Sequence, residues 1–142
     1  MNRRKSRAGW SLENHVEHIL TEAKIPYAAR ATEIEGEPDI VIPSVEAYMD
    51  KKYPRDRLCL LGVKTTCKDR WRQVLHEGEG ITRKHLLTMQ RGISEKQLKQ
   101  MTKAKVTLIV PEGLHKDYPK VEGVKLVRVA DFIDWARALV KV

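Results

Sequence analysis

The sequence has little that would support a secreted or membrane-embedded protein. It contains two cysteines, and no apolar run approaches the ~20 residues that a membrane-spanning helix needs. The basic N-terminus runs directly into polar residues and lacks the apolar stretch of a signal peptide. Cys59 and Cys67 lie in or at the end of one expected strand and cannot fold back to bridge each other. We therefore expect free thiols in a cytoplasmic protein without a membrane partner.

Several common catalytic and binding motifs are also absent. His15 and His18 lack the spacing of the His-Glu-x-x-His zinc motif, and the chain has no Cys-x-x-Cys pair. There is no glycine-rich loop for a dinucleotide or a phosphate, and no Gly-x-Ser-x-Gly nucleophile turn. Zinc proteins, nucleotide-binding folds and serine hydrolases are unsupported, which leaves carboxylates and lysine as the available catalytic groups.

Positive charge, in contrast, is abundant. The 142 residues include 27 Lys and Arg against 19 Asp and Glu, a net charge of +8. This balance favours a polyanionic partner, with nucleic acid ahead of an acidic membrane surface. Residues 1–9 are basic and show no apolar period, which predicts a flexible arm before a single domain over residues 10–142. Arg4 and Arg7 in this arm are expected to contact DNA phosphates whatever the base sequence.

Apolar periodicity predicts strands that alternate with helices. Leu12, Val16 and Leu20 recur at helical spacing after Ser11, a favourable N-cap residue. Strands are expected near residues 27–32, 39–42, 58–66, 86–90, 106–110 and 124–129, and helices near residues 11–23, 69–77, 94–101 and 130–139. The polar segment 44–57 has no clear pattern. Such alternation predicts an α/β fold with a mixed central β-sheet flanked by helices.

Two apolar runs are bounded by charged side chains that suit metal-dependent hydrolysis. Asp39 precedes the run Ile40–Ile42, and Lys64 follows the run 58–63. If these strands are neighbours, a carboxylate and an ammonium group meet in one cleft, and Mg²⁺ prefers oxygen ligands of this kind. Each residue taken alone is more often an ordinary strand end at the surface. The residues by themselves leave both interpretations open.

A frequent nuclease pattern has an acidic residue two positions before the lysine, where this chain has Gly62. A second acidic ligand must then come from elsewhere, and Glu77 in the next expected helix is the best candidate. A carboxylate at the C-terminal end of a helix is slightly unfavourable with the helix dipole, which favours a functional explanation for it. Beyond Lys64, the side chains of Lys68, Asp69, Arg70 and Arg72 offer donors and acceptors for base edges and phosphates.

The run Lys-Thr-Thr-Cys-Lys-Asp-Arg-Trp-Arg-Gln over residues 64–73 resembles the C-terminal catalytic domain of EcoRII-type restriction endonucleases, in the PD-(D/E)xK nuclease superfamily. The resemblance extends to Arg-Ala-Gly-Trp-Ser-Leu-Glu over residues 7–13, Glu-Pro-Asp over residues 37–39, Lys-His-Leu over residues 84–86 and Gly-Ile-Ser-Glu-Lys-Gln-Leu over residues 92–98. It implies a restriction-endonuclease-like fold in which the acidic residue has moved from the lysine strand to the next helix. Asp39, Lys64 and Glu77 are then the catalytic set, with Asp39 and Glu77 holding the metal.

The resemblance implies roles for further residues. Glu13 matches an auxiliary active-site carboxylate, and Tyr48 and Lys68 match positions near the site of that family. Lys68, Asp69 and Arg70 resemble its basic-acidic-basic reader of adjacent C·G pairs, in which aspartate accepts from cytosine and arginine donates to guanine.

We therefore predict a Mg²⁺-dependent type II restriction endonuclease that acts as a homodimer. Its expected substrate is double-stranded DNA with a short palindromic site that contains CC/GG pairs. Two alternatives stay open: a sequence-specific DNA-binding module that does not cleave, and a structure-specific or repair nuclease of the same fold.

Overall fold

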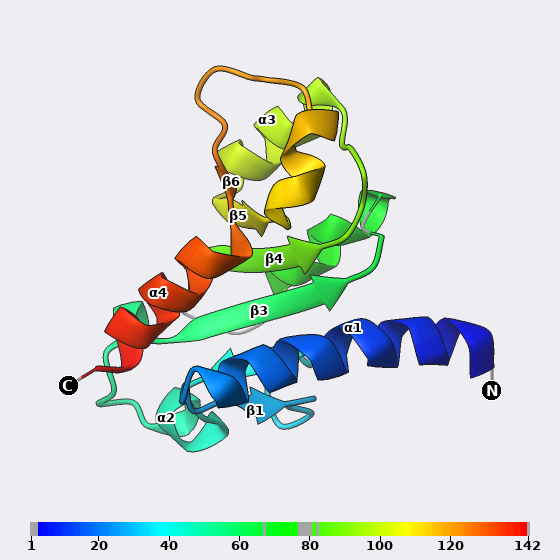
Figure 1. Ribbon diagram of the computed structural model, residues 1–142. Coiled ribbons are helices and arrows are strands. Elements are labelled where there is room, and N and C mark those ends of the chain that lie inside the picture. Colours follow the sequence, from blue (N-terminus) through cyan, green and yellow to red (C-terminus); the bar gives the residue numbers. More distant parts are fainter. Residues whose placement is uncertain (1–2, 67, 77–80, 82, 142) are drawn as a thin grey trace.

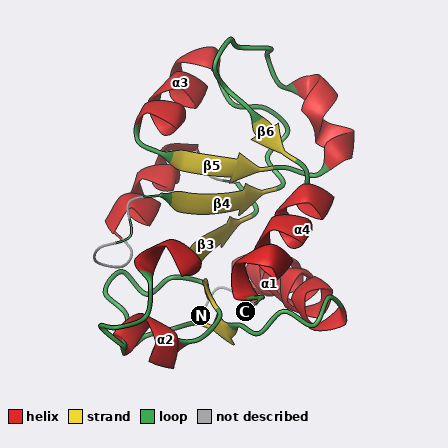
Figure 2. Cartoon of the chain, turned by 90° about the vertical axis from the view of Figure 1, so that its left-hand side faces the viewer, coloured by secondary structure: helices red, strands yellow, loops and turns green. Residues whose placement is uncertain are grey.

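The computed structural model describes residues 3–66, 68–76, 81 and 83–141, which form a six-stranded sheet with helices on its faces (Figures 1 and 2). The strands are β1 (Ala28–Ala29), β2 (Ile40–Ile42), β3 (Cys59–Lys64), β4 (Lys84–Thr88), β5 (Val106–Ile109) and β6 (Leu126–Val127). The helices are α1 (Arg3–Glu22), α2 (Val45–Met49), α3 (Glu95–Lys103) and α4 (Val129–Val140), with 3-10 helices η1 (Arg55–Arg57), η2 (Lys68–His76) and η3 (Glu112–Asp117). The predicted α/β fold is confirmed.

The sheet is mixed, and its strand order follows the chain from β1 to β6. The first three strands pair antiparallel, and the strands from β3 to β6 pair parallel. In the antiparallel pair of β2 and β3, Ile40 lies opposite Leu61 and Ile42 lies opposite Cys59. The beginning of β2 is therefore next to the end of β3, and this register positions the candidate site.

Alternate residues of the strands point into different parts of the core, as the period of two in a β-strand requires. Ile40, Leu61 and Val63 pack with the apolar side chains of α1 and α4. Val41 and Leu60 pack on the other face, in a cluster that includes α2. A further cluster joins η2 and α3 to β4 and β5. Figure 1 shows α1 alongside β3, and the two elements are in contact.

Helix α1 begins at Arg3, inside the basic segment 1–9 for which a flexible arm was predicted. The apolar repeat that revealed this helix starts only at Leu12, whereas arginine, lysine and alanine extend a helix by their backbone propensity without an apolar face. Ser11 accordingly lies inside the helix and does not cap it. The division of the chain into an arm and a domain stays a prediction.

Most of the other expected elements are present: the strands are mostly shorter than expected, β4 begins two residues earlier, and α3 and α4 are slightly longer. Ser94 caps α3 by accepting a hydrogen bond from the Gln97 N–H. The segment 44–57, which had no clear pattern, contains α2 and η1, and Ser44 caps α2 in the same manner. In the part of the chain that the structure describes, no helix is both long and apolar enough to cross a lipid bilayer.

Candidate active site

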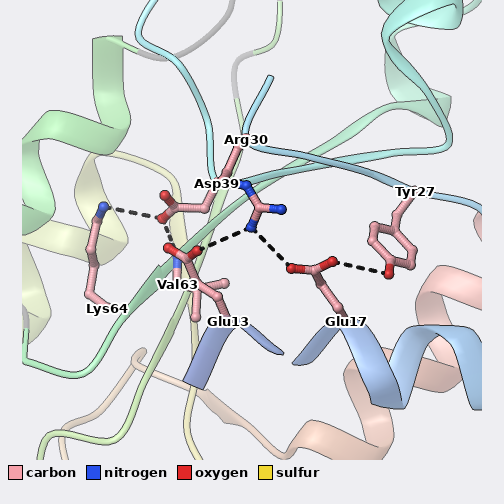
Figure 3. Close-up of polar contacts among 7 residues, drawn as sticks. All are labelled: Glu13, Glu17, Tyr27, Arg30, Asp39, Val63 and Lys64. Atoms are coloured by element: carbon pink, nitrogen blue, oxygen red, sulfur yellow. Dashed lines mark hydrogen bonds and ion pairs between the residues drawn. The ribbon is translucent and has the colours of Figure 1, made fainter. Parts of the chain in front are cut away.

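Asp39 and Lys64 meet where β2 begins and β3 ends (Figure 3). The Asp39 Oδ2 accepts a hydrogen bond of 2.7 Å from the Val63 N–H and lies 3.1 Å from the Lys64 Nζ. The two side chains are 16% and 27% exposed, so the pair is partly shielded from water and open on one side. The structure thus brings together the two residues that the sequence placed at neighbouring strand ends.

Glu13 brings a second carboxylate to this pair from the middle of α1 (Figure 3). Burial raises the pKa of Glu13, and the negative charge of Asp39 raises that pKa further. The positive charges of Lys64 and Arg30 act in the opposite direction without cancelling the rise. Glu13 was expected here only from the resemblance, because nothing in the local sequence of α1 points one of its carboxylates toward β3.

Arg30 connects Asp39 to α1 and was missed by the sequence analysis. Its backbone N–H donates a 2.8 Å hydrogen bond to the Asp39 carbonyl, and its φ of 52° lies in the left-handed region that is uncommon outside glycine. Its guanidinium Nη1 lies 3.9 Å from Glu13 and 3.4 Å from Glu17, and the Tyr27 hydroxyl donates to Glu17 at 3.3 Å (Figure 3). The one available signal was the four-residue spacing of the two glutamates, which puts both carboxylates on one helix face.

The donor set of the described residues is compatible with a hard divalent cation. Asp39 and Glu13 supply carboxylate oxygens, the ligands that Mg²⁺ prefers. Their mutual repulsion, visible in the raised pKa of Glu13, is an interaction that a bound dication relieves. Among the described residues no group of three His, Cys, Asp or Glu is set to hold a metal. Glu77, the predicted second ligand, lies outside the described residues.

The glycine that replaces the usual acidic residue on β3 has a packing reason. A Cβ added to Gly62 would lie 3.0 Å from Val74 Cγ2 and 3.4 Å from Leu86 Cδ1. Val74 is fully buried and belongs to η2, the 3-10 helix that follows the lysine strand. The space of an acidic side chain at this position is therefore occupied by η2, and a second acidic ligand has to come from another element.

Tyr48, a predicted catalytic residue, lies on α2 and is 8% exposed. The Arg55 guanidinium lies over its ring, 4.8 Å from the centroid, and Arg55 Nη1 donates a 2.7 Å hydrogen bond to the Tyr48 carbonyl. These contacts fix the tyrosine in the cluster beneath β2 and β3. Its catalytic role stays a prediction.

The predicted base reader begins η2, directly after the lysine strand. The side chains of Lys68, Asp69 and Arg70 lie outside the described part of the structure, as do those of Arg4 and Arg7. Arg72 is exposed; its guanidinium lies over the buried Trp71 ring at 4.8 Å and donates to Gln100 Oε1 at 3.0 Å. Their contacts with DNA stay predictions.

Comparison with known sequences decides the family. The sequence model of the EcoRII C-terminal family matches residues 1–133. The chain belongs to the EcoRII C-terminal family. The type II restriction enzyme EcoRII of Escherichia coli is 46% identical over 134 residues, which make up 93% of this chain and 33% of that enzyme. This family member thus spans about a third of the length of that relative.

Solved structures show the same fold for this EcoRII C-terminal family member. Ecl18kI, metal-depleted and in complex with uncleaved, modified DNA, has a TM-score of 0.82 and 27% identity, over 96% of this chain and 46% of that chain. The restriction endonuclease PspGI in complex with substrate DNA has a TM-score of 0.74 and 18% identity, over 96% of this chain and 63% of that one, and shows the fold alone. The predicted restriction-endonuclease-like fold is confirmed.

Proposed function

We propose that this chain is a Mg²⁺-dependent endonuclease that hydrolyses phosphodiester bonds of double-stranded DNA. The observation that carries the proposal is the meeting of Asp39, Lys64 and Glu13 at one end of the sheet, in a member of the EcoRII C-terminal family. The metal-depleted and DNA-bound states in which Ecl18kI was solved support both the cation and the polymer as partners.

Asp39 is the proposed metal ligand within the described site, with Glu77 as the second ligand and Glu13 as an auxiliary carboxylate. The Val63 N–H fixes Asp39 Oδ2 at 2.7 Å, so the carboxylate is oriented before any cation arrives. When bound, Mg²⁺ would acidify a water molecule and offset the charge of the scissile phosphate. Glu13, whose pKa is already raised, can also hold a proton close to the reacting water.

Lys64 is the proposed electrostatic partner of the scissile phosphate. Its ammonium group lies 3.1 Å from Asp39 and reaches the partly exposed end of β3. A fixed cation at this position stabilises the negative charge that develops when water attacks phosphorus. The reaction breaks a P–O bond of the strand, and the expected products carry a 5′-phosphate and a 3′-hydroxyl group.

Sequence specificity is assigned to the start of η2. Lys68, Asp69 and Arg70 would read adjacent C·G pairs, with Asp69 accepting from cytosine and Arg70 donating to guanine. Arg72, together with Arg4 and Arg7, would contact phosphates. The proposed enzyme is of type II and reads a short palindromic site that contains CC/GG pairs. It would act as a homodimer, because the two-fold symmetry of a dimer matches the two-fold symmetry of a palindrome.

Cleavage of a sequenced plasmid tests the proposal. With MgCl₂ we expect discrete fragments whose ends map to one sequence, and with EDTA we expect none. Asp39→Ala should abolish the fragments, whereas Asp117→Ala removes an exposed aspartate far along the chain and should leave them unchanged. Retarded bands without cutting would favour a DNA-binding module, and cuts confined to junctions or mismatches would favour a repair nuclease.

A further inference from the structure

An aromatic cluster lies at the opposite end of the parallel strands from Asp39 and Lys64. His85 is near the start of β4, whereas Lys64 pairs with Thr88 at the end of that strand. The His85 ring packs against Trp135 of α4 with centroids 4.7 Å apart and planes 31° apart. Trp135 is 40% exposed, so one part of this large apolar ring is open to solvent. An exposed tryptophan beside a buried histidine is a surface on which a planar molecule can stack.

Two hollows flank this aromatic pair. One has a volume of about 410 Å³ and the other about 310 Å³, and both are lined by Arg83, His85 and Trp135. The second hollow is also lined by Thr107 and Lys125. Volumes of this order are typical of sites that enclose a small ligand. Because Arg83, His85 and Trp135 line both hollows, one ligand in contact with Trp135 can reach both.

His85 contributes a buried, uncharged ring to the walls of both hollows. The side chain is 5% exposed, and among the described residues its Nδ1 has no hydrogen-bond partner. Burial, with a smaller contribution from Arg83, lowers the pKa of His85 to about 4, so the ring is neutral near physiological pH. A neutral imidazole offers one donor and one acceptor. The Nδ1 atom has almost no accessible surface, so a ligand in the hollows meets the neutral ring of His85 and does not reach this nitrogen.

The charged side chains around the hollows favour an anion. Arg83 lines both hollows and Lys125 lines the second, and the Arg83 Nη1 donates to Thr107 Oγ1 at 3.0 Å, which orients the guanidinium. The first hollow is also lined by Arg55 and Asp56. Asp131 also lines the second hollow, but both of its carboxylate oxygens accept hydrogen bonds from Arg128, at 2.8 and 3.1 Å. Asp131 is therefore already paired, and basic side chains outnumber acidic ones in the described lining of each hollow, so Arg83 and Lys125 are placed to bind a phosphate.

We propose that the hollows around His85 and Trp135 bind a nucleotide unit, an aromatic base that carries a phosphate. The base stacks on the indole of Trp135, and the phosphate lies between Arg83 and Lys125. A nucleotide combines a planar ring with an anion, which match the exposed indole and the basic side chains of this lining. The same unit occurs as a free nucleotide and in single-stranded DNA, and the test below separates these sources.

Nuclear magnetic resonance of the whole chain in EDTA provides the test. The indole N–H signal of Trp135, assigned by its loss in Trp135→Phe, is followed while one of four probes is added. The probes are deoxyadenosine 5′-monophosphate, deoxyadenosine, inorganic phosphate and a short single-stranded oligodeoxynucleotide. We expect a saturable shift with the nucleotide, at an affinity about tenfold above that of the nucleoside or of phosphate, since stacking and charge both contribute.

Two variants locate the site, and neither changes a residue that has a role in the proposed cleavage mechanism. Lys125→Ala should weaken the nucleotide by about three- to tenfold, whereas Lys120→Ala removes an exposed lysine outside the hollows and should not. Arg83→Ala removes the basic side chain that lines both hollows, so it should weaken the nucleotide by a similar factor while leaving the indole signal and the folded spectrum in place. Tighter binding of the oligonucleotide than of the monophosphate identifies single-stranded DNA as the source, and the reverse order identifies a free nucleotide.

Absence of a saturable shift at Trp135, or equal binding by wild type, Lys125→Ala and Arg83→Ala, overturns the inference. The result does not depend on the proposed nuclease activity. Asp39→Ala should lose cleavage and keep the nucleotide-dependent shift. A protein that cleaves DNA without this shift would overturn the present inference alone.

Discussion

The pKa of Glu13 is set by groups that raise it and groups that lower it, and a substitution at this residue tests which effect is larger. Burial and the charge of Asp39 raise its pKa, and Lys64 and Arg30 lower it by less. Because the pKa is higher in the folded chain than in the unfolded one, the folded state binds the proton more tightly. The free energy of unfolding therefore falls as the pH rises through the interval between the two values. Above that interval Glu13 is ionised in both the folded and the unfolded chain, and the free energy of unfolding stays lower by a constant amount.

Glu13→Gln removes this cost and should raise Tm by about 1–3 °C at about pH 8 in EDTA. In acid, below the ordinary pKa of a glutamate, the difference should vanish, because both side chains are then neutral. Added MgCl₂ should stabilise the wild type more than the variant, since the cation offsets the repulsion between Glu13 and Asp39. Thermal unfolding followed by circular dichroism measures all three effects. Glu22→Gln, at a glutamate of α1 whose side chain is 71% exposed, is the control, and a lower Tm for Glu13→Gln in EDTA contradicts the argument.

At the scale of elements, the contact between β3 and η2 explains why the lysine strand has a glycine. An alanine Cβ at Gly62 would lie 3.0 Å from Val74 Cγ2, which is tighter than most Cβ contacts in proteins, so Val74 would have to shift by a few tenths of an ångström. Gly62→Ala should lower the free energy of unfolding by about 1–3 kcal/mol, measured by urea denaturation. Val74→Ala should recover part of this loss in the double variant and cost stability by itself. Gly113→Ala is the matched control, because nothing lies within 4 Å of its added Cβ, and equal losses at the two glycines would contradict the packing argument.

The early start of α1 has a test of its own. If residues 3–9 are helical, Ala8→Gly should lower the free energy of unfolding by about 0.5–1 kcal/mol, because glycine loses more backbone entropy in a helix. Far-ultraviolet circular dichroism during thermal unfolding reports both the stability and the helix content. An unchanged transition would instead support the flexible arm that the sequence suggested.

The strands were predictable because their signal is local. β2, β3 and β5 are nearly unbroken apolar runs, and each was found close to its observed bounds. β1 has two residues and lies within the strand expected over residues 27–32, whereas α2, with five residues, is too short for a period to be counted. The pairing of Asp39 with Lys64 followed from their places at strand ends. Arg30 could not be found in this way, because its contacts join a loop to a distant helix and its left-handed backbone has no signature in an arginine.

For the whole molecule, the net charge of +8 implies that much of the affinity for DNA is independent of base sequence. Each phosphate contact contributes about −0.9 to the slope of log K against log[salt] on duplex DNA. A contact to a base edge instead contributes about 1–3 kcal/mol of discrimination and little to that slope. The two kinds of basic residue in this chain can thus be told apart by two measurements on one set of variants.

Arg4→Ala with Arg7→Ala should make the salt slope shallower by about two and leave the preferred sequence unchanged. Arg70→Ala should weaken binding to the preferred site by about 1–3 kcal/mol and relax the preference for C·G pairs, while non-cognate duplexes are bound nearly as before. Fluorescence anisotropy in EDTA, at several salt concentrations, measures both without cleavage. Lys120→Ala controls for the loss of one exposed positive charge. If Arg70→Ala weakens all duplexes equally, this arginine contacts a phosphate, and the assignment of base reading to the start of η2 is wrong.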